Sequence, residues 1–82
     1  SFWLQKWSDR FYPDFVVELE DGRILVVEYK GPHLAETPEE LHKKELGELW
    51  AARSGGRGLF LWAVERDRHG RGVREQLRVI VS

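Results

Sequence analysis

Three charged residues at a fixed spacing are the features of this sequence best suited to chemistry. Asp14 follows Pro13, and Glu28 and Lys30 come directly after the apolar residues 24–27. Residues two apart in a β-strand share a face, which would put Glu28 and Lys30 on one side, about 6.7 Å apart along the chain. Ionisable groups at the end of a largely buried strand cost free energy unless they are paired or bind a metal. We therefore treat Asp14, Glu28 and Lys30 as the candidate site.

Paired carboxylates and a lysine are suited to phosphodiester hydrolysis. If Asp14 and Glu28 come close, they repel by about 4 kcal/mol at an effective dielectric of 20. A divalent cation removes this penalty, and the hard oxygen ligands favour Mg²⁺ or Mn²⁺ over zinc. Lys30 on the same face could hold a water molecule or a developing phosphoryl charge beside the metal.

A predicted β-hairpin has to bring these residues together. Residues 15–20 and 24–30 are rich in β-branched side chains, and Asp21-Gly22 lies between them, which is a strong hairpin signal. The two runs are therefore expected to be antiparallel neighbours.

The length of the hairpin loop decides whether Asp14 can reach Glu28. A two-residue loop would pair Asp14 with Tyr29 and turn its carboxylate away from Glu28. A three-residue loop, with Gly22 left-handed in a bulge, would set Asp14 across from Glu28, with their β-carbons about 5 Å apart. A bulge near Pro13 would have the same effect. A shared metal site therefore requires the three-residue loop or such a bulge.

The same residues carry a resemblance to a known family. Pro13-Asp14, thirteen further residues and Glu28-Tyr29-Lys30 resemble the signature of the PD-(D/E)XK nuclease superfamily. Residues 11–31 (FYPDFVVELEDGRILVVEYKG), with Lys43-Lys44 and Trp50 beyond a loop, are similar to the C-terminal endonuclease domain of type III restriction enzyme Res subunits. The resemblance covers roughly residues 11–52 and falls on a predicted hairpin followed by a helix.

The resemblance implies a metal-dependent DNA endonuclease. Asp14 and Glu28 would ligate Mg²⁺ (or Mn²⁺), Lys30 would position the attacking water, and Lys43 or Lys44 would contact a phosphate. The chain would belong to a larger restriction or helicase–nuclease polypeptide. The family usually adds an acidic residue from a helix before the first strand, and these 82 residues leave no room for that helix.

The rest of the chain predicts a mixed sheet with a crossover helix. Residues 2–7 are read as a short strand and 33–36 as a loop. Thr37-Pro38 begins a helix in which Glu40 closes a capping box. Its apolar stripe is expected to consist of Leu41, Leu46, Leu49 and Trp50.

Two further strands complete the prediction. The continuous apolar run 59–64 indicates a strand buried on both faces, and the alternation within 73–81 indicates a last strand at an edge. Residues 1–82 are thus predicted to be one domain of the α/β or α+β class. Its order is β-β-β-α-β-β, which is restriction-endonuclease-like without the usual N-terminal helix.

Charge is distributed unevenly along the chain. Residues 1–52 hold six Lys/Arg against eleven Asp/Glu, whereas residues 53–82 hold seven Arg against three acids. Arginines around the turn at 67–72 are read either as a solvated turn or as contacts to a nucleic-acid backbone. The candidate contacts there are Arg66, Arg68 and Arg71. The absence of cysteine excludes disulfides, Cys-ligated zinc and thiol nucleophiles.

Other functions remain open on the sequence alone. One alternative is a catalytically inactive nucleic-acid-binding or assembly module of the same fold, and another is a small α/β domain with no nucleic-acid role. The short length and the four tryptophans favour association, such as a homodimer. The longest apolar run is far below the roughly 20 residues of a membrane span, so we expect no membrane partner and a cytoplasmic location.

Overall fold

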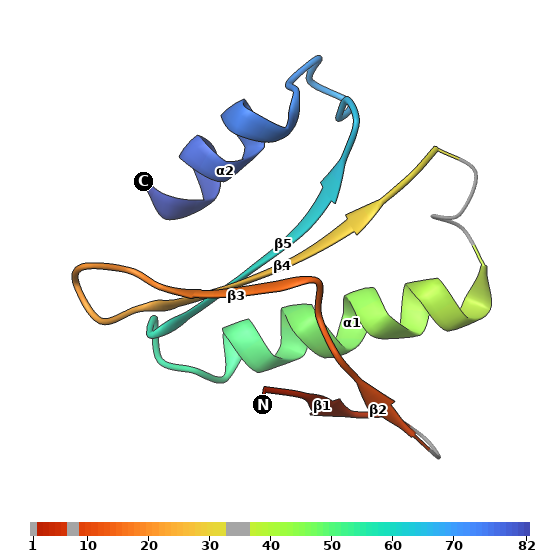
Figure 1. Cartoon of the computed structure of the whole chain (residues 1–82), viewed down its shortest axis with the longest axis vertical. Helices are drawn as coiled ribbons and strands as arrows, with labels where there is room; N and C mark the ends of the chain where they lie inside the picture. The colour runs from red at the N-terminus through yellow and green to blue at the C-terminus, as the bar shows by residue number, and fades with distance from the viewer. Residues whose placement is uncertain (1, 7–8, 33–36) are drawn as a thin grey trace.

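A three-stranded mixed sheet with a helix on each face forms the centre of the structure (Figure 1). The computed structural model describes residues 2–6, 9–32 and 37–82, so the predicted loop 33–36 lies outside the described residues. The described residues form, in chain order, β1 (Leu4–Gln5), β2 (Arg10–Phe11), β3 (Phe15–Glu18), β4 (Ile24–Lys30), α1 (Pro38–Ala52), β5 (Gly58–Val64) and α2 (Val73–Val81). The chain therefore has a mixed α+β fold, as its sequence predicts.

The hairpin of β3 and β4 has the register that a shared site requires. Phe15 pairs with Val27 in an antiparallel ladder. The Leu19 N–H donates to the Arg23 carbonyl at 2.8 Å, which leaves a three-residue loop between these two residues. In that loop Gly22 has φ +90°, a backbone conformation that favours glycine. The three-residue alternative is confirmed, and it brings Asp14 level with Glu28.

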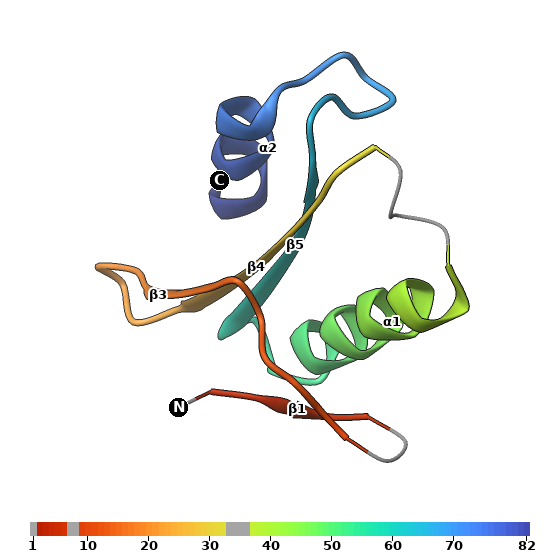
Figure 2. The same ribbon diagram turned by 45° about the vertical axis from the view of Figure 1, so that its right-hand side comes forward.

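Strand β4 lies at the centre of the sheet, between antiparallel β3 and parallel β5. Parallel strands begin at the same end of a sheet, so the chain has to run back along the sheet between β4 and β5. Helix α1 makes this crossover. This confirms the predicted crossover. The predicted strand 59–64 is also confirmed, and it is covered on both faces because α1 packs on one and α2 on the other (Figure 2).

Alternation along β4 sends its side chains to two separate cores. Val26 packs with Phe11 and Phe60 on the face that α1 covers. Leu25 and Val27 pack with Ala63 on the face that α2 covers. Since even-numbered residues of β4 face α1, Glu28 and Lys30 also lie on the α1 face.

The face of α1 that meets the sheet matches the predicted apolar stripe only in part, since Trp50 packs against the core. Leu41 and Leu49 are exposed, whereas Gly47 is the buried residue of the helix. A Cβ atom at Gly47 would lie 2.3 Å from the Phe60 ring, so only glycine lets the helix come this close. Glu40 lies two turns before Gly47 on the same face. The face of α1 that meets the sheet is therefore charged in the first turns of the helix and consists of small or apolar residues further along.

The predicted last strand is wrong, because residues 73–81 form helix α2. Val73, Leu77, Ile80 and Val81 recur at helical spacing, and the last three pack against the core beneath. Gln76 is also buried, and its side chain bonds both the N–H and the carbonyl of Val64 at the end of β5. Residues 73–81 form a helix and not an edge strand because the helix covers a face of the sheet that would otherwise be exposed to water.

The N-terminal residues form a separate small sheet. β1 pairs with β2 through Leu4 and Phe11, so the short strand predicted within 2–7 is present at Leu4–Gln5. It does not extend the sheet of β3, β4 and β5. Within the described ranges, no helix is long and apolar enough to cross a membrane.

Candidate active site

Two hydrogen bonds connect Asp14 to the end of β4, one to the side chain of Glu28 and one from the backbone of Tyr29. The Asp14 backbone N–H donates to Glu28 Oε1 at 3.0 Å, and the Tyr29 backbone N–H donates to Asp14 Oδ2 at 2.8 Å. Each carboxylate is thus held by the backbone of the opposite strand. Asp14 is exposed, whereas Glu28 is only 4% exposed. The arrangement fixes one acid at the surface beside one acid in the interior.

Lys30 joins this pair and links it to helix α1. Its ammonium Nζ lies 2.9 Å from Glu28 Oε2 and is also paired with Glu40 Oε1. The other oxygen of Glu40 is 3.1 Å from the ammonium of Lys43. The side chain of Lys30 is 11% exposed. Charges of alternating sign therefore run from the end of β4 to the first turn of α1.

The two central members of this network stay charged despite their burial. Burial lowers the pKa of Lys30, but hydrogen bonds to Glu40 and Glu28 outweigh it and leave the pKa above its ordinary value. Burial raises the pKa of Glu40, but hydrogen bonds from Lys30 and Lys43 outweigh it and leave the pKa below its ordinary value. The pKa shifts therefore favour the charged forms of both Lys30 and Glu40, which pair with each other.

The carboxylates could hold a divalent cation, but they supply only part of its shell. Among the residues that the structure describes, no three acidic or histidine side chains come together in a group that could hold a metal ion. Asp14 Oδ1 makes no hydrogen bond within these residues, so one oxygen is available at the surface of the site. Mg²⁺ usually keeps several waters and takes only one or two carboxylates. Both oxygens of Glu28 have partners in the structure, so the donor set would fit Mg²⁺ or Mn²⁺ once a Glu28 oxygen is released, with water or phosphate oxygens as further ligands.

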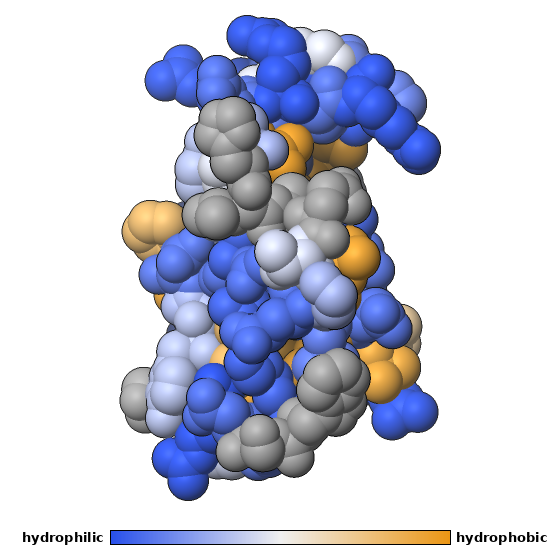
Figure 3. All heavy atoms as spheres, turned by 90° about the vertical axis from the view of Figure 1, so that its right-hand side faces the viewer, coloured by the Kyte–Doolittle hydropathy of each residue, from blue (hydrophilic) through white to orange (hydrophobic). Residues whose placement is uncertain are grey.

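A depression of about 500 Å³ opens beside Lys30 between the ends of β4 and β5. Trp62 lines it together with the loop that follows β5. Its charged lining consists of four cations and two acids: Lys30, Lys44, Arg66, Arg68, Glu65 and Asp67. The face of the molecule that includes the end of β4 and the start of α1 is mainly hydrophilic (Figure 3). Three of the predicted phosphate contacts, Lys44, Arg66 and Arg68, thus lie around the candidate catalytic lysine.

The other two predicted phosphate contacts are engaged elsewhere. Lys43 pairs with Glu40, and its ammonium lies 5.7 Å from the centre of the Phe11 ring. The Arg71 guanidinium donates from Nε to Asp67 Oδ2 at 2.8 Å, and Arg71 lines a different hollow, beside α2. The charges of Lys43 and Arg71 are paired with acidic residues of the protein, so a nucleic acid is not needed to account for them.

Glu40 is the member of the site that the sequence did not single out. A capping box predicts that its carboxylate bonds the backbone of Thr37. Half of the box is present, since Thr37 Oγ1 accepts from the Glu40 N–H at 3.2 Å, while the Glu40 carboxylate pairs with Lys30 and Lys43. Glu40 could have been identified from its position on the helix, because it lies on the face of α1 that passes over the end of β4.

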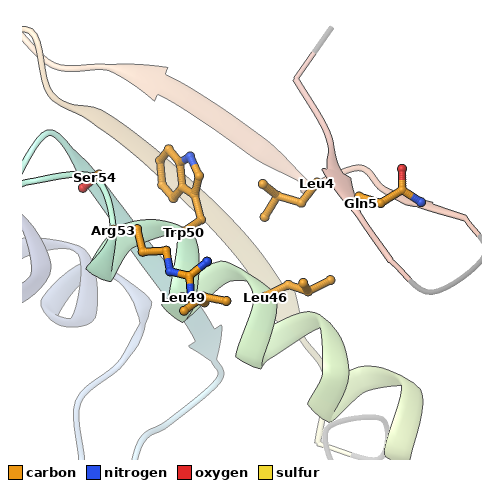
Figure 4. Close-up of a pocket in the computed structure, with 7 residues that line it drawn as sticks. All are labelled: Leu4, Gln5, Leu46, Leu49, Trp50, Arg53 and Ser54. Atoms are coloured by element: carbon orange, nitrogen blue, oxygen red, sulfur yellow. The ribbon is translucent and has the colours of Figure 1, made fainter.

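Another hollow, of about 340 Å³, lies between β1 and the C-terminal half of α1. Its lining consists of Leu4, Gln5, Leu46, Leu49, Trp50, Arg53 and Ser54 (Figure 4). It contains none of the acidic residues or lysines of the network. The charged network at the end of β4 therefore lies apart from this hollow.

Comparison of the chain with protein-family models, with curated proteins and with solved structures finds no match. Any function assigned to it must rest on the residues and geometry of the site.

Proposed function

We propose that this chain is a metal-dependent nuclease domain of the PD-(D/E)XK type, which hydrolyses phosphodiester bonds of DNA. The observation that carries the proposal is the hairpin register. It sets Asp14 level with Glu28, and the ammonium of Lys30 lies 2.9 Å from the same glutamate. The antiparallel hairpin, crossover helix and parallel strand are also the arrangement expected of a restriction-endonuclease-like core.

Asp14, Glu28 and Lys30 would each have a separate role in hydrolysis. Asp14 and Glu28 would hold Mg²⁺ or Mn²⁺ through carboxylate oxygens. Such an ion, when bound, polarises a phosphoryl oxygen and lowers the pKa of a bound water. Lys30 donates hydrogen bonds to the attacking water or to the negative charge that develops on the phosphoryl oxygens. The water oxygen would form a bond to phosphorus as the bond from phosphorus to one sugar oxygen breaks. The water would lose a proton to solvent, and the leaving sugar oxygen would take one up from solvent.

The cations around the depression would bring the substrate to this point. Phosphate contacts from lysine and arginine supply most of the sequence-independent affinity for DNA. Arg66 and Arg68 are exposed on the loop after β5, on the same side as Lys30. A DNA backbone bound along this depression would have one phosphate next to the candidate site.

One observation favours a second candidate, a nucleic-acid-binding module without turnover. Both oxygens of Glu28 already have partners in the protein, Asp14 N–H and the Lys30 ammonium. Such a module would keep the depression and its cations but would bind no metal.

Metal binding and cleavage distinguish the two functions. At a Mn²⁺ concentration tenfold above Kd, binding should stabilise the protein by about 1.4 kcal/mol, or about 6–11 °C in Tm. DNA should be cut only when the metal is present. Asp14→Asn and Glu28→Gln should lose both effects, and Lys30→Met should lose cleavage.

The matched control is Glu18→Gln, which removes an exposed carboxylate at the far end of β3, where Glu18 pairs with Ile24. It should keep the metal-dependent rise in Tm and the cleavage. Equal Mn²⁺ responses in wild type, Asp14→Asn and Glu18→Gln would contradict the nuclease. DNA binding without any Mn²⁺ response would favour the module.

A further inference from the structure

Lys30 has two carboxylate partners, and they come from different elements of the fold. Glu28 precedes it on β4, and Glu40 reaches it from the first turn of α1. Both acids are largely buried, with side-chain exposures of 5% and 14%. One carboxylate balances the charge of the ammonium, but the largely buried Lys30 has three N–H donors, and Glu40 supplies a second acceptor for them.

Glu28 cannot serve Lys30 and a divalent cation equally well. Its Oε2 faces the ammonium in the structure. Positive charge beside Glu28 would repel the ammonium and weaken its attraction to this carboxylate. Lys30 would then leave the site unless another negative group held it there.

Glu40 is well placed and firmly held for this role. Its backbone is fixed by the Thr37 cap at the start of α1, and its second oxygen is held by Lys43 at 3.1 Å. Gly47, two turns further along the same face, keeps α1 close to the sheet. The direction of the Glu40 carboxylate is therefore set by contacts that do not involve Glu28.

From this geometry we infer that Glu40 is a positioning residue, which holds the Lys30 ammonium in the site when Glu28 turns to a metal ion. The inference rests on the proposed function. Lys43 has the supporting role of holding Glu40, which also accounts for the engagement of Lys43 away from the phosphate depression.

The test compares Mn²⁺ affinity, measured by calorimetry without DNA, in four variants: Glu40→Gln, Lys30→Met, the double variant, and Glu39→Gln. Glu39 is the matched control, because it is the neighbouring acid on the same helical turn and pairs instead with Lys6. Without Glu40, Lys30 competes harder for Glu28. We expect Glu40→Gln to weaken Mn²⁺ binding about tenfold, or about 1.4 kcal/mol.

The double variant separates this role from a general effect of charge. When Lys30 is already Met, no ammonium competes, so Glu40→Gln should change the affinity less than about twofold. A through-space effect of one lost charge would instead weaken binding equally in both backgrounds. Glu39→Gln should leave the affinity unchanged.

Cleavage kinetics give a second readout. Because Glu40 acts through Lys30 and does not contact DNA, Glu40→Gln should lower kcat about tenfold or more while KM stays unchanged. Glu39→Gln should alter neither.

The outcomes distinguish the inference from the function on which it rests. A wild type that binds no Mn²⁺ and cuts no DNA overturns both. A wild type that binds and cuts, with Glu40→Gln indistinguishable from Glu39→Gln, overturns the role of Glu40 alone. An equal effect of Glu40→Gln with and without Lys30 overturns it as well.

Discussion

Gly47→Ala tests whether the close approach of α1 to the sheet is what the fold depends on. The added Cβ would lie 2.3 Å from Cε1 of Phe60 and 2.4 Å from its Cδ1 and Cζ. Ordinary carbon contacts need about 3.5–4.0 Å, so the ring or the helix would have to move by about 1 Å or more. The Phe60 ring has little room to move, since it is 7% exposed and packed with Val26 and Phe11.

Two opposing effects set the size of the change. Overpacking a core costs about 1–3 kcal/mol. Alanine in place of glycine within a helix returns about 1 kcal/mol through helix propensity. The difference between the two effects is a destabilisation of up to about 2 kcal/mol for Gly47→Ala, or a fall in Tm of up to about 16 °C.

The assay is urea and thermal unfolding followed by tryptophan fluorescence, with Phe60→Leu as the second mutation. Leucine lacks the atoms that correspond to Cε1 and Cζ, so it removes two of the three close contacts. Gly47→Ala should therefore cost far less in the Phe60→Leu background, and helix propensity could make it stabilising there. If Gly47→Ala stabilised the wild type, or cost the same in both backgrounds, the proposed close packing would be wrong.

Two further predictions concern the charges around the depression. Replacement of three cations by glutamine should weaken DNA binding for all sequences and reduce the slope of log K against log salt by about 2.7, as measured by fluorescence anisotropy. These cations are Lys44, Arg66 and Arg68. Arg53→Gln with Arg57→Gln, at the opposite end of β5, should have a smaller effect; equal losses would contradict the predicted path. The Arg71 backbone N–H and side chain hold the pKa of Asp67 at about 2, below its ordinary value of 3.8. The stability that Asp67 contributes is thus fully present above pH 3.8 and is lost as pH falls through 2; an NMR titration midpoint near 3.8 would contradict this.

The hairpin could be predicted from the sequence because its signals are local. Asp21-Gly22 between two β-branched runs has few other solutions. The sequence left two registers open, however, and a one-residue change decides whether Asp14 reaches Glu28. The structure has the three-residue loop, in which Leu19 pairs with Arg23 and Gly22 takes a positive φ.

Residues 73–81 show where local pattern fails. Alternation near the end of this segment favours a strand, while Val73, Leu77, Ile80 and Val81 also fit a helix. The choice depends on what the rest of the molecule leaves uncovered. With α1 on one face of the sheet, Leu25, Val27 and Ala63 need a cover on the other, and α2 provides it.

The residue types at the end of β4, and the face that they share, can be read from their order along one strand. Their partners depend on how α1 packs against the sheet. Glu40 lies ten residues beyond Lys30 and was read from local pattern as a helix cap. It meets Lys30 because α1 packs against the sheet at Gly47, and a contact made by packing two elements leaves no signal in either one alone.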